Sequence, residues 1–479
     1  MLKIFDPLIK GSQGATTETG MPTNRYLPAA SRSPADHLLP FGRLALLGFQ
    51  HVLVMYAAAI AVPLIIGGAL NLPKDQIAHL ISADLFVSGL VTMVQTIGIP
   101  FFGVRLPIMM GVSFTGIGTM IAIASKAQLG LPGVFGSMLA AGAIIILLAP
   151  LIARILRFFP TVVVGTILLT IGVSLMQVSV LWAAGGFGVK DFGNPVYIAI
   201  AFAVMLFIIL VAKYSRGFIN NVSVLFGIGF GIATSMLLGK VDFSGVSEAP
   251  WLDLVLPFRF GAFRFDLWSI VSMTVVMMVN VIETAGVFVA VSRMADKPVS
   301  QDDLVRGFRA DGLGSVLGAV FNIFPYTSYS ENVGLLEVTG VRSRWVCATG
   351  GAILVLLALV PKLSAVVASV PVFVLGGVGM IMFGMIGVTG IKMLSRVDFV
   401  QQPLNGFTVA ISIGVGLTPV FAQHFFDRFP AELAPLLQSG IVLAAICAVG
   451  LNVLFNGFGD PRDALTDDPP SSETALVNK

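Results

Sequence analysis

The sequence predicts an all-α polytopic membrane protein. Its 479 residues are 56% hydrophobic and only 11% charged, and the mean hydropathy is +0.94. Soluble chains carry about 25% charged residues, so this composition excludes an ordinary soluble globular protein. Apolar stretches recur between Arg43 and Phe455, and many reach the roughly 20 residues that a helix needs to cross a bilayer. Few polar linkers separate them, so we predict one membrane domain.

Both ends of the chain are polar. Residues 1–40 are rich in Ser, Thr, Pro and Gly and have no long apolar run of the kind found in signal peptides. Residues 459–479 have a similar composition. We therefore predict disordered tails at residues 1–40 and 459–479 and a membrane domain at residues 41–458.

Fourteen stretches are candidates to cross the membrane. Eleven are clearly apolar: 44–67, 77–98, 133–153, 161–183, 195–212, 220–238, 268–291, 345–361, 370–391, 403–421 and 435–455. Three are less clear, because 106–124 is rich in Gly, Ser and Thr, 312–324 is short and 325–338 is polar.

The placement of basic residues favours the full count of fourteen. With fourteen spans both termini lie on one side, and 20 of the 28 Lys and Arg residues fall on that side. Cytoplasmic loops are enriched in Lys and Arg, so we expect a protein of the inner (plasma) membrane with both termini in the cytoplasm. Removing the polar stretch 325–338 from the count erodes this bias.

Two of the unclear stretches indicate a transporter. "GVSFTGIGTM" (111–120) lies in the third stretch and "FPYTSYSENVG" (324–334) in the tenth, seven stretches apart. In two inverted repeats of seven spans they occupy equivalent places, and interrupted segments at matching positions point to a binding site. Irregular backbone at membrane depth survives only where it is buried or lines a cavity.

Glu283 is the acid placed most deeply in an apolar stretch, in "MVNVIETAGVFVAV". A central acid costs about 2.5 kcal/mol or more on insertion scales, so we expect it to face the protein interior. A functional carboxyl group is our preferred interpretation, and a neutral structural Glu is the alternative.

A polar cluster follows in the tenth stretch at Ser330, Glu331 and Asn332. Carboxylate, amide and hydroxyl groups together suit a flat heterocycle, because they both donate and accept hydrogen bonds. The alternative is a polar loop outside the membrane, against which the distribution of basic residues argues.

Ser113 and Phe114 occupy the matching third stretch. Phe114 is placed to stack on an aromatic ligand and Ser113 to donate a hydrogen bond, although ordinary helix packing explains small residues equally well. His51 favours an organising hydrogen bond to another span over direct proton coupling. Asp311 either caps a helix or belongs to a proton path.

Other classes of function lack their motifs. "GGFG" and "LGGVGM" are not followed by GK[ST], so no P-loop is present. We find no His/Cys cluster with metal-ligand spacing and no nucleophile elbow, so we expect no enzyme, metal or cofactor. The net charge of +3 does not suggest nucleic acid as a partner. A channel would use rings of equivalent groups, which two unlike acids do not form.

The stretch "SENVGLLEVTG" resembles the signature of the nucleobase–ascorbate transporter family, in its xanthine and urate permease branch. Glu331, Asn332, Gly334, Thr339 and Gly340 occupy the signature places in order, and four further blocks are similar: "QHVLVMYAAAIAVP", "VIETAG", "RADGLG" and "VRSRWV".

This resemblance implies fourteen spans in two inverted sevens, with short strands in spans 3 and 10. A core domain of spans 1–4 and 8–11 would move against a gate domain of spans 5–7 and 12–14. It also implies a homodimer that imports nucleobases with protons. By position, Glu283, Glu331, Asn332 and Ser113 match substrate-site residues, whereas Asp311 and His51 match residues tied to function and, with Glu283, to proton coupling.

The sequence leaves two classes of substrate, oxopurines and uracil. The wider sequence resembles carriers of oxopurines such as xanthine and urate. Glu331, however, stands where many oxopurine carriers have Gln and uracil carriers have Glu, so a uracil carrier is the alternative. Gly340 stands where Arg is frequent, so that side chain does not help to select the substrate.

Overall fold

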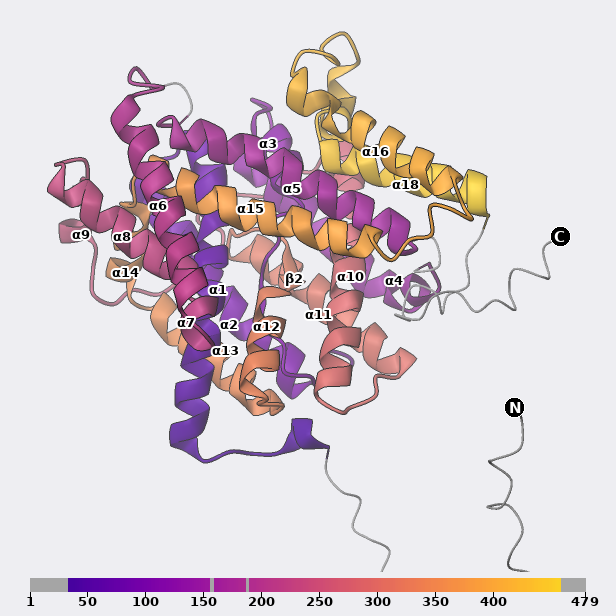
Figure 1. The fold of residues 1–479 in the computed structure, drawn as a ribbon, viewed down its shortest axis with the longest axis horizontal. Coiled ribbons are helices and arrows are strands. Elements are labelled where there is room, and N and C mark those ends of the chain that lie inside the picture. The colour runs from indigo at the N-terminus through magenta and orange to yellow at the C-terminus, as the bar shows by residue number, and fades with distance from the viewer. Residues whose placement is uncertain (1–32, 156–158, 187–188, 458–479) are drawn as a thin grey trace, which may run out of the picture. The chain divides into compact units, whose positions relative to one another are not determined.

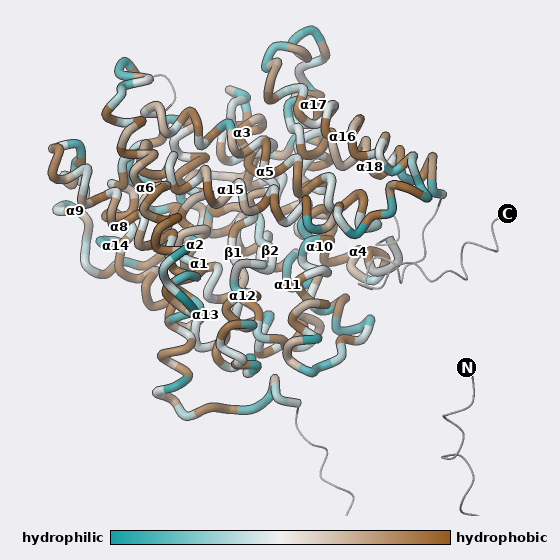
Figure 2. Tube along the Cα trace, in the orientation of Figure 1, coloured by the Kyte–Doolittle hydropathy of each residue, from teal (hydrophilic) through white to brown (hydrophobic). Residues whose placement is uncertain are grey.

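The computed structural model describes residues 33–155, 159–186 and 189–457 of the chain. Within these ranges the protein is helical, with one small two-stranded sheet (Figure 1). Hydrophobic residues dominate the helices, and hydrophilic residues gather in the connections between them (Figure 2).

The elements follow one another in an order that matches the predicted stretches. They are η1 Pro34–Asp36, α1 Phe41–Ala69, α2 Lys74–Ile97, β1 Met110–Val112, α3 Ile117–Ala124, α4 Gly130–Ile155, α5 Thr161–Ala183, α6 Pro195–Tyr214, α7 Phe218–Asn221, α8 Ser223–Leu237, α9 Ser244–Glu248, α10 Leu267–Met294, α11 Gln301–Val320, β2 Tyr326–Ser328, α12 Glu331–Thr339, α13 Arg344–Ala358, α14 Pro361–Ala368, α15 Val372–Leu394, α16 Leu404–Phe421, η3 Ala431–Leu433, α17 Ala434–Leu437 and α18 Gly440–Asn456.

The protein is a multi-pass membrane protein. Among the described residues, eight helices are long and apolar enough to cross a bilayer, and α13 with α14 adds a ninth as a pair bent by 82°. Helices α8 and α18 are shorter but also apolar. Each of the fourteen predicted stretches contains a helix or a strand, and the number that cross stays a prediction.

Helix α11 begins well before the predicted stretch 312–324. It runs from Gln301 because Ser300 and Asp303 form a capping box, in which each side chain bonds the other residue's backbone N–H. The sequence signal for this helix start is the Ser-x-x-Asp spacing at Ser300 and Asp303, within the charged stretch before residue 312. The helix therefore has a full 20 residues.

The helices pack in two groups. One contains α1 to α4 and α10 to α13, and the other contains α5, α6, α8, α15, α16 and α18. The contacts between helices come in matched pairs. In the first group, the contact of α2 with α13 matches that of α11 with α4. In the second group, the contact of α6 with α8 matches that of α16 with α18. Each of these elements has a counterpart seven predicted stretches away in the sequence. Replacing both helices of one pair by their counterparts gives the other pair.

Glycines allow the closest helix contacts in the first group. A Cβ atom on Gly89 of α2 would lie 2.4 Å from the carbonyl oxygen of Gly351 on α13. In the matching pair, a Cβ atom on Gly142 of α4 would lie 2.9 Å from the carbonyl oxygen of Gly312 on α11. Both crossings therefore depend on small residues, as is common between membrane helices.

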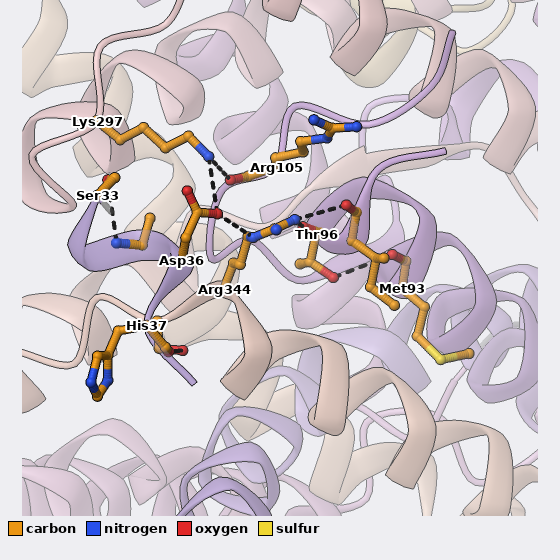
Figure 3. Close-up of polar contacts among 11 residues, drawn as sticks. Ser33, Asp36, His37, Met93, Thr96, Arg105, Lys297 and Arg344 are labelled. Atoms are coloured by element: carbon orange, nitrogen blue, oxygen red, sulfur yellow. Dashed lines mark hydrogen bonds and ion pairs between the residues drawn. The ribbon is translucent and has the colours of Figure 1, made fainter. Parts of the chain in front are cut away.

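The predicted boundary of the N-terminal tail is wrong for residues 33–40. Residues 1–32 and 458–479 lie outside the described ranges, but residues 33–40 are folded and include η1. The segment is fixed by ion pairs from Asp36 to Arg344 Nε, at 2.7 Å, and to Lys297 Nζ, at 3.5 Å (Figure 3). Composition alone does not reveal these long-range partners.

The same two cations tie several connections together. Arg344 Nη1 donates to the carbonyl oxygens of Thr96 and Ile97, at 2.9 and 2.7 Å, and Lys297 Nζ donates to that of Arg105 at 3.0 Å (Figure 3). Burial lowers the pKa of Lys297, and attraction to Asp36 opposes that shift. The N-terminal segment therefore joins the end of α2 to the loops before α11 and α13.

The helix crossing at Gly89 gives a direct test of the packing. Gly89→Ala places a methyl group against the Gly351 carbonyl and should lower the thermal stability of the purified protein, since overpacking costs about 1–3 kcal/mol. Gly414→Ala is the matched control, because nothing lies within 4 Å of a Cβ atom at that position of α16. Equal melting temperatures for the two variants, measured in the same detergent, would contradict the packing described.

Candidate functional site

The two interrupted stretches meet as an antiparallel pair of strands. Met110 pairs with Ser328, Gly111 with Thr327 and Val112 with Tyr326. The ladder continues outside the strands, because the Ser113 N–H donates to the Pro325 carbonyl at 2.7 Å. All six strand residues are buried. Segments more than 200 positions apart in the sequence thus satisfy each other's backbone groups in the protein interior.

Gly111 is required at the centre of this pair. A Cβ atom there would lie 2.5 Å from the ring of Tyr329, whose hydroxyl donates to the Val112 carbonyl at 2.9 Å. Any larger residue would push the Tyr329 ring away and break that bond.

Helix α10 holds both strands through polar side chains. The Ser113 hydroxyl, just after β1, donates to Asn280 Oδ1 at 2.8 Å. The Thr284 hydroxyl lies 3.2 Å from that of Thr327 and accepts from the Ser328 N–H at 3.3 Å. Neither Asn280 nor Thr284 was predicted as a site residue, although their spacing of four places both on the helix face next to Glu283.

Glu283 lies on this part of α10 and is partly exposed. It is near enough to Asp311 on α11 for the two carboxyl groups to interact electrostatically. The structure therefore brings together two of the acids that the sequence analysis selected, from neighbouring helices.

Asp311 is completely buried on α11. Its Oδ1 atom accepts from Gln95 Nε2 of α2 at 3.4 Å, and the Thr284 hydroxyl faces the same carboxyl group. Its Oδ2 atom has no hydrogen-bond partner among the described residues. Asp311 is the eleventh residue of the helix that begins at Gln301, so its expected alternative role as a helix cap is wrong.

Asn332 bonds His51 and joins α12 to α1. Its Nδ2 atom lies 3.1 Å from His51 Nδ1 and donates to the His51 carbonyl at 3.0 Å. A hydrogen bond from His51 to another membrane segment was expected, and in the structure its partner lies on the short helix α12. The Oδ1 atom of Asn332 has no partner among the described residues.

Phe114 follows β1 and packs edge-to-face on Phe383 of α15, with ring centroids 5.7 Å apart. Helix α15 belongs to the second group of helices, so this aromatic pair bridges the two groups. A phenylalanine within an apolar run carries no signal of its own, and Phe383 was not predicted.

The remaining predicted residues lie at the start of α12. Ser330 is exposed at the helix N-cap and makes no side-chain capping bond. Glu331 is the first residue of α12, and its side chain lies outside the part of the structure that is described.

Helix α2 supports the strands from the other side. The Thr92 hydroxyl accepts from the Met110 N–H at 2.9 Å. The Tyr326 hydroxyl of β2 donates to Asp84 Oδ1 at 2.9 Å, and the Ser88 hydroxyl donates to the same atom at 3.1 Å. Both strands are therefore anchored to α2 as well as to α10.

The arrangement can bind a small polar molecule but holds no evident metal site. Among the residues that the structure describes, no three His, Cys, Asp or Glu side chains gather closely enough to hold a metal ion. The groups near the strands are carboxyl, amide, hydroxyl and backbone groups, together with one aromatic pair.

The sequence matches a known family over most of its length. Residues 42–425 match the Xan_ur_permease model, described as "Permease family". The uric acid transporter UacT of Escherichia coli is 49% identical over 433 residues, which cover 90% of each chain. The nucleobase transporter PlUacP of Paenibacillus larvae is 44% identical, covering 85% of this chain and 94% of that protein. The xanthine permease of Bacillus subtilis is 41% identical, covering 88% and 96%.

Solved structures with little sequence identity share the fold. The transmembrane domain of the cyanobacterial bicarbonate transporter BicA aligns with a TM-score of 0.56 at 14% identity, covering 87% of this chain and 99% of that one. SLC26A9 aligns with a TM-score of 0.58 at 13% identity, covering 87% and 66%. At these identities the likeness concerns the fold alone. The family match and the close relatives show that the chain belongs to the nucleobase–ascorbate transporter family of permeases.

Proposed function

We propose that this permease is a proton-coupled symporter that imports an oxopurine, xanthine or urate, across the inner membrane. The observation that carries the proposal is the buried strand pair, which Phe114 follows and which α10 contacts through Thr284, the neighbour of Glu283. Its relatives are named as uric acid and xanthine transporters. A uracil or pyrimidine symporter of the same fold is the alternative, which Glu331 favours.

The base would lie where the two groups of helices meet, beside Phe114. Glu283 and Glu331 would accept N–H bonds from the base, and Ser113, Ser330 and backbone N–H groups near the strands would bond its oxo groups. The orphaned Oδ1 of Asn332 supports a polar ligand near α12, because buried polar groups normally find partners.

Proton coupling would use Glu283 and Asp311, with His51 in support. The two carboxyl groups interact, and the Asp311 Oδ2 atom is buried without a partner among the described residues. Burying an unpaired ionised carboxylate is costly. Binding a proton from outside would therefore favour the state that also binds the base, and release of both would follow on the inner side.

The movement would be a rocking of a core against a gate. We propose fourteen spans as two inverted sevens, with the first helix group as core and the second as gate. The matched helix contacts support this arrangement, because each contact in one half of the sequence has an equivalent contact between the counterpart elements seven stretches away. Because the strands are hydrogen-bonded to α2, α10 and α11, all in the first helix group, the site would move as part of one rigid body. The proposal includes cytoplasmic termini, disordered tails beyond the membrane domain, and a homodimer.

Substrate competition tests the function itself. Purified protein in liposomes should take up labelled xanthine saturably and show counterflow, and excess unlabelled urate should inhibit that uptake. Guanine, uracil and ascorbate complete the panel. Inhibition by uracil alone would overturn the oxopurine assignment, and flux that rises linearly with concentration would indicate a channel.

Glu283→Gln should abolish accumulation of substrate driven by a pH gradient, because the amide does not titrate and has one acceptor oxygen where the carboxylate has two. Uptake in liposomes with an imposed gradient measures this. Glu337→Gln is the matched control, since Glu337 is exposed on α12. A Glu283 variant that still concentrates substrate with unchanged pH dependence would refute the role.

Phe114→Ala should raise KM for the base by roughly 2–10-fold, the equivalent of losing an aromatic contact of about 0.5–1.5 kcal/mol. Phe207→Ala removes a stacked pair with Phe230 inside the second helix group and should leave KM unchanged. An unaltered KM in the Phe114 variant would place the base elsewhere.

A further inference from the structure

Gln95 is a buried amide whose hydrogen bonds reach three separate segments. It lies near the end of α2 and is fully buried. Its Nε2 atom donates to the Gly307 carbonyl at 3.3 Å and to Asp311 Oδ1 at 3.4 Å, both on α11. Its Oε1 atom accepts from the Val104 N–H at 3.1 Å. One side chain thus joins the buried acid of α11 to the segment that leads into β1.

The segment that leads into β1, residues 98–109, has a tightly defined backbone. Phe101 and Arg105 have φ angles of 68° and 61°, which non-glycine residues adopt at a cost. A Cβ atom on Gly103 would lie 2.2 Å from the Val94 carbonyl, and the Gly103 N–H donates to the Arg306 carbonyl at 2.9 Å. The segment therefore fits closely between α2 and α11.

This segment is fixed at Val104 by the Gln95 side chain, and again at Arg105 and at Met110, the residue that follows it. The Gln95 carbonyl accepts from the Arg105 N–H at 3.0 Å, and Lys297 holds the Arg105 carbonyl from the loop before α11. One turn earlier on α2, Thr92 bonds Met110, the first residue of β1. A shift of the Gln95 side chain would consequently act on β1 through a short and well-packed connection.

We propose that Gln95 is a positioning residue that links the protonation of Asp311 to the placement of strand β1. An ionised carboxylate accepts a charge-assisted bond, roughly twice as strong as a neutral one. Loss of that charge weakens the bond from Gln95 Nε2 and frees the amide, whose Oε1 atom holds the segment before β1. This inference rests on the proposed function, because it assigns a path between the proton and the substrate strand.

The charged groups around Asp311 are few. Glu283 faces it from α10, and Asp84 of α2 lies across Tyr326 of β2, to which it is hydrogen-bonded. Residues 130–152 of α4 carry no charged side chain, and Arg306 and Arg309 precede Asp311 on α11 itself. Two neutral side chains also face this carboxyl group: Thr284, which bonds β2, and Gln95, which bonds the segment before β1.

The test compares Gln95→Leu and Gln95→Glu with Gln177→Leu, in liposomes at several pH values. Gln177 on α5 makes one comparable side-chain bond, to the Val420 carbonyl at 3.1 Å. Gln95→Leu should reduce accumulation driven by a pH gradient about tenfold while retaining substrate counterflow. Gln95→Glu should move the pH profile of uptake upward by roughly one unit, because two adjacent carboxyl groups share a proton. The control should keep the wild-type profile.

The near-isosteric Gln95→Glu variant keeps the test decisive if Gln95→Leu does not fold. A wild-type pH profile in Gln95→Glu, at wild-type levels in the membrane, would overturn the proposal. Equal loss of counterflow and accumulation in folded Gln95→Leu would also overturn it. Failure of the proposed function is separate, since it would show as absence of purine uptake by the wild-type protein.

Discussion

The structure depends on the pairing of two three-residue strands in the interior of a membrane protein. Unpaired backbone groups are costly where water is absent, so neither interrupted stretch is stable there without the other. Once paired, β1 and β2 place Ser113, Phe114 and the start of α12 at one location. The side chains of α2 and α10 then fix the pair, through Thr92 and Tyr326 on one side and through Asn280 and Thr284 on the other.

This arrangement concentrates polar groups inside an otherwise apolar protein without leaving most of them unsatisfied. Among the described residues, the buried atoms near the strands that lack a hydrogen-bond partner include Asp84 Oδ2, Asn280 Nδ2, Asp311 Oδ2 and Asn332 Oδ1. Glycine crossings between α2 and α13 and between α4 and α11 make the surrounding group of helices compact. Contact with the second group at Phe383 places the site where a relative movement of the two groups would open or close it.

Sequence patterns predicted the helical membrane fold, whereas the roles of the candidate site residues stay predictions. The two polar interruptions at matching positions were predicted to mark a binding site, and the structure pairs them as strands. Glu283 stood out as a costly acid within an apolar stretch. Asn280, Thr284, Gln95 and Phe383 could not be selected, because single amides, hydroxyls and phenylalanines are common in apolar helices and only the packing gives them partners. Asn332 illustrates the same limit, since its amide bonds His51. The capping box at Ser300 and Asp303 is a sequence signal for the early start of α11, but the signal lies within a charged stretch that was predicted to be a loop.

The central claim is that the strand pair and its flanking side chains form the nucleobase site. An experimental structure of the protein with bound xanthine tests it most directly. We expect the base to lie between the first helix group and α15, with its ring beside Phe114 and a ring N–H within hydrogen-bonding distance of Glu283. Xanthine bound away from the strands, with Glu283 facing lipid or bulk water, would contradict it.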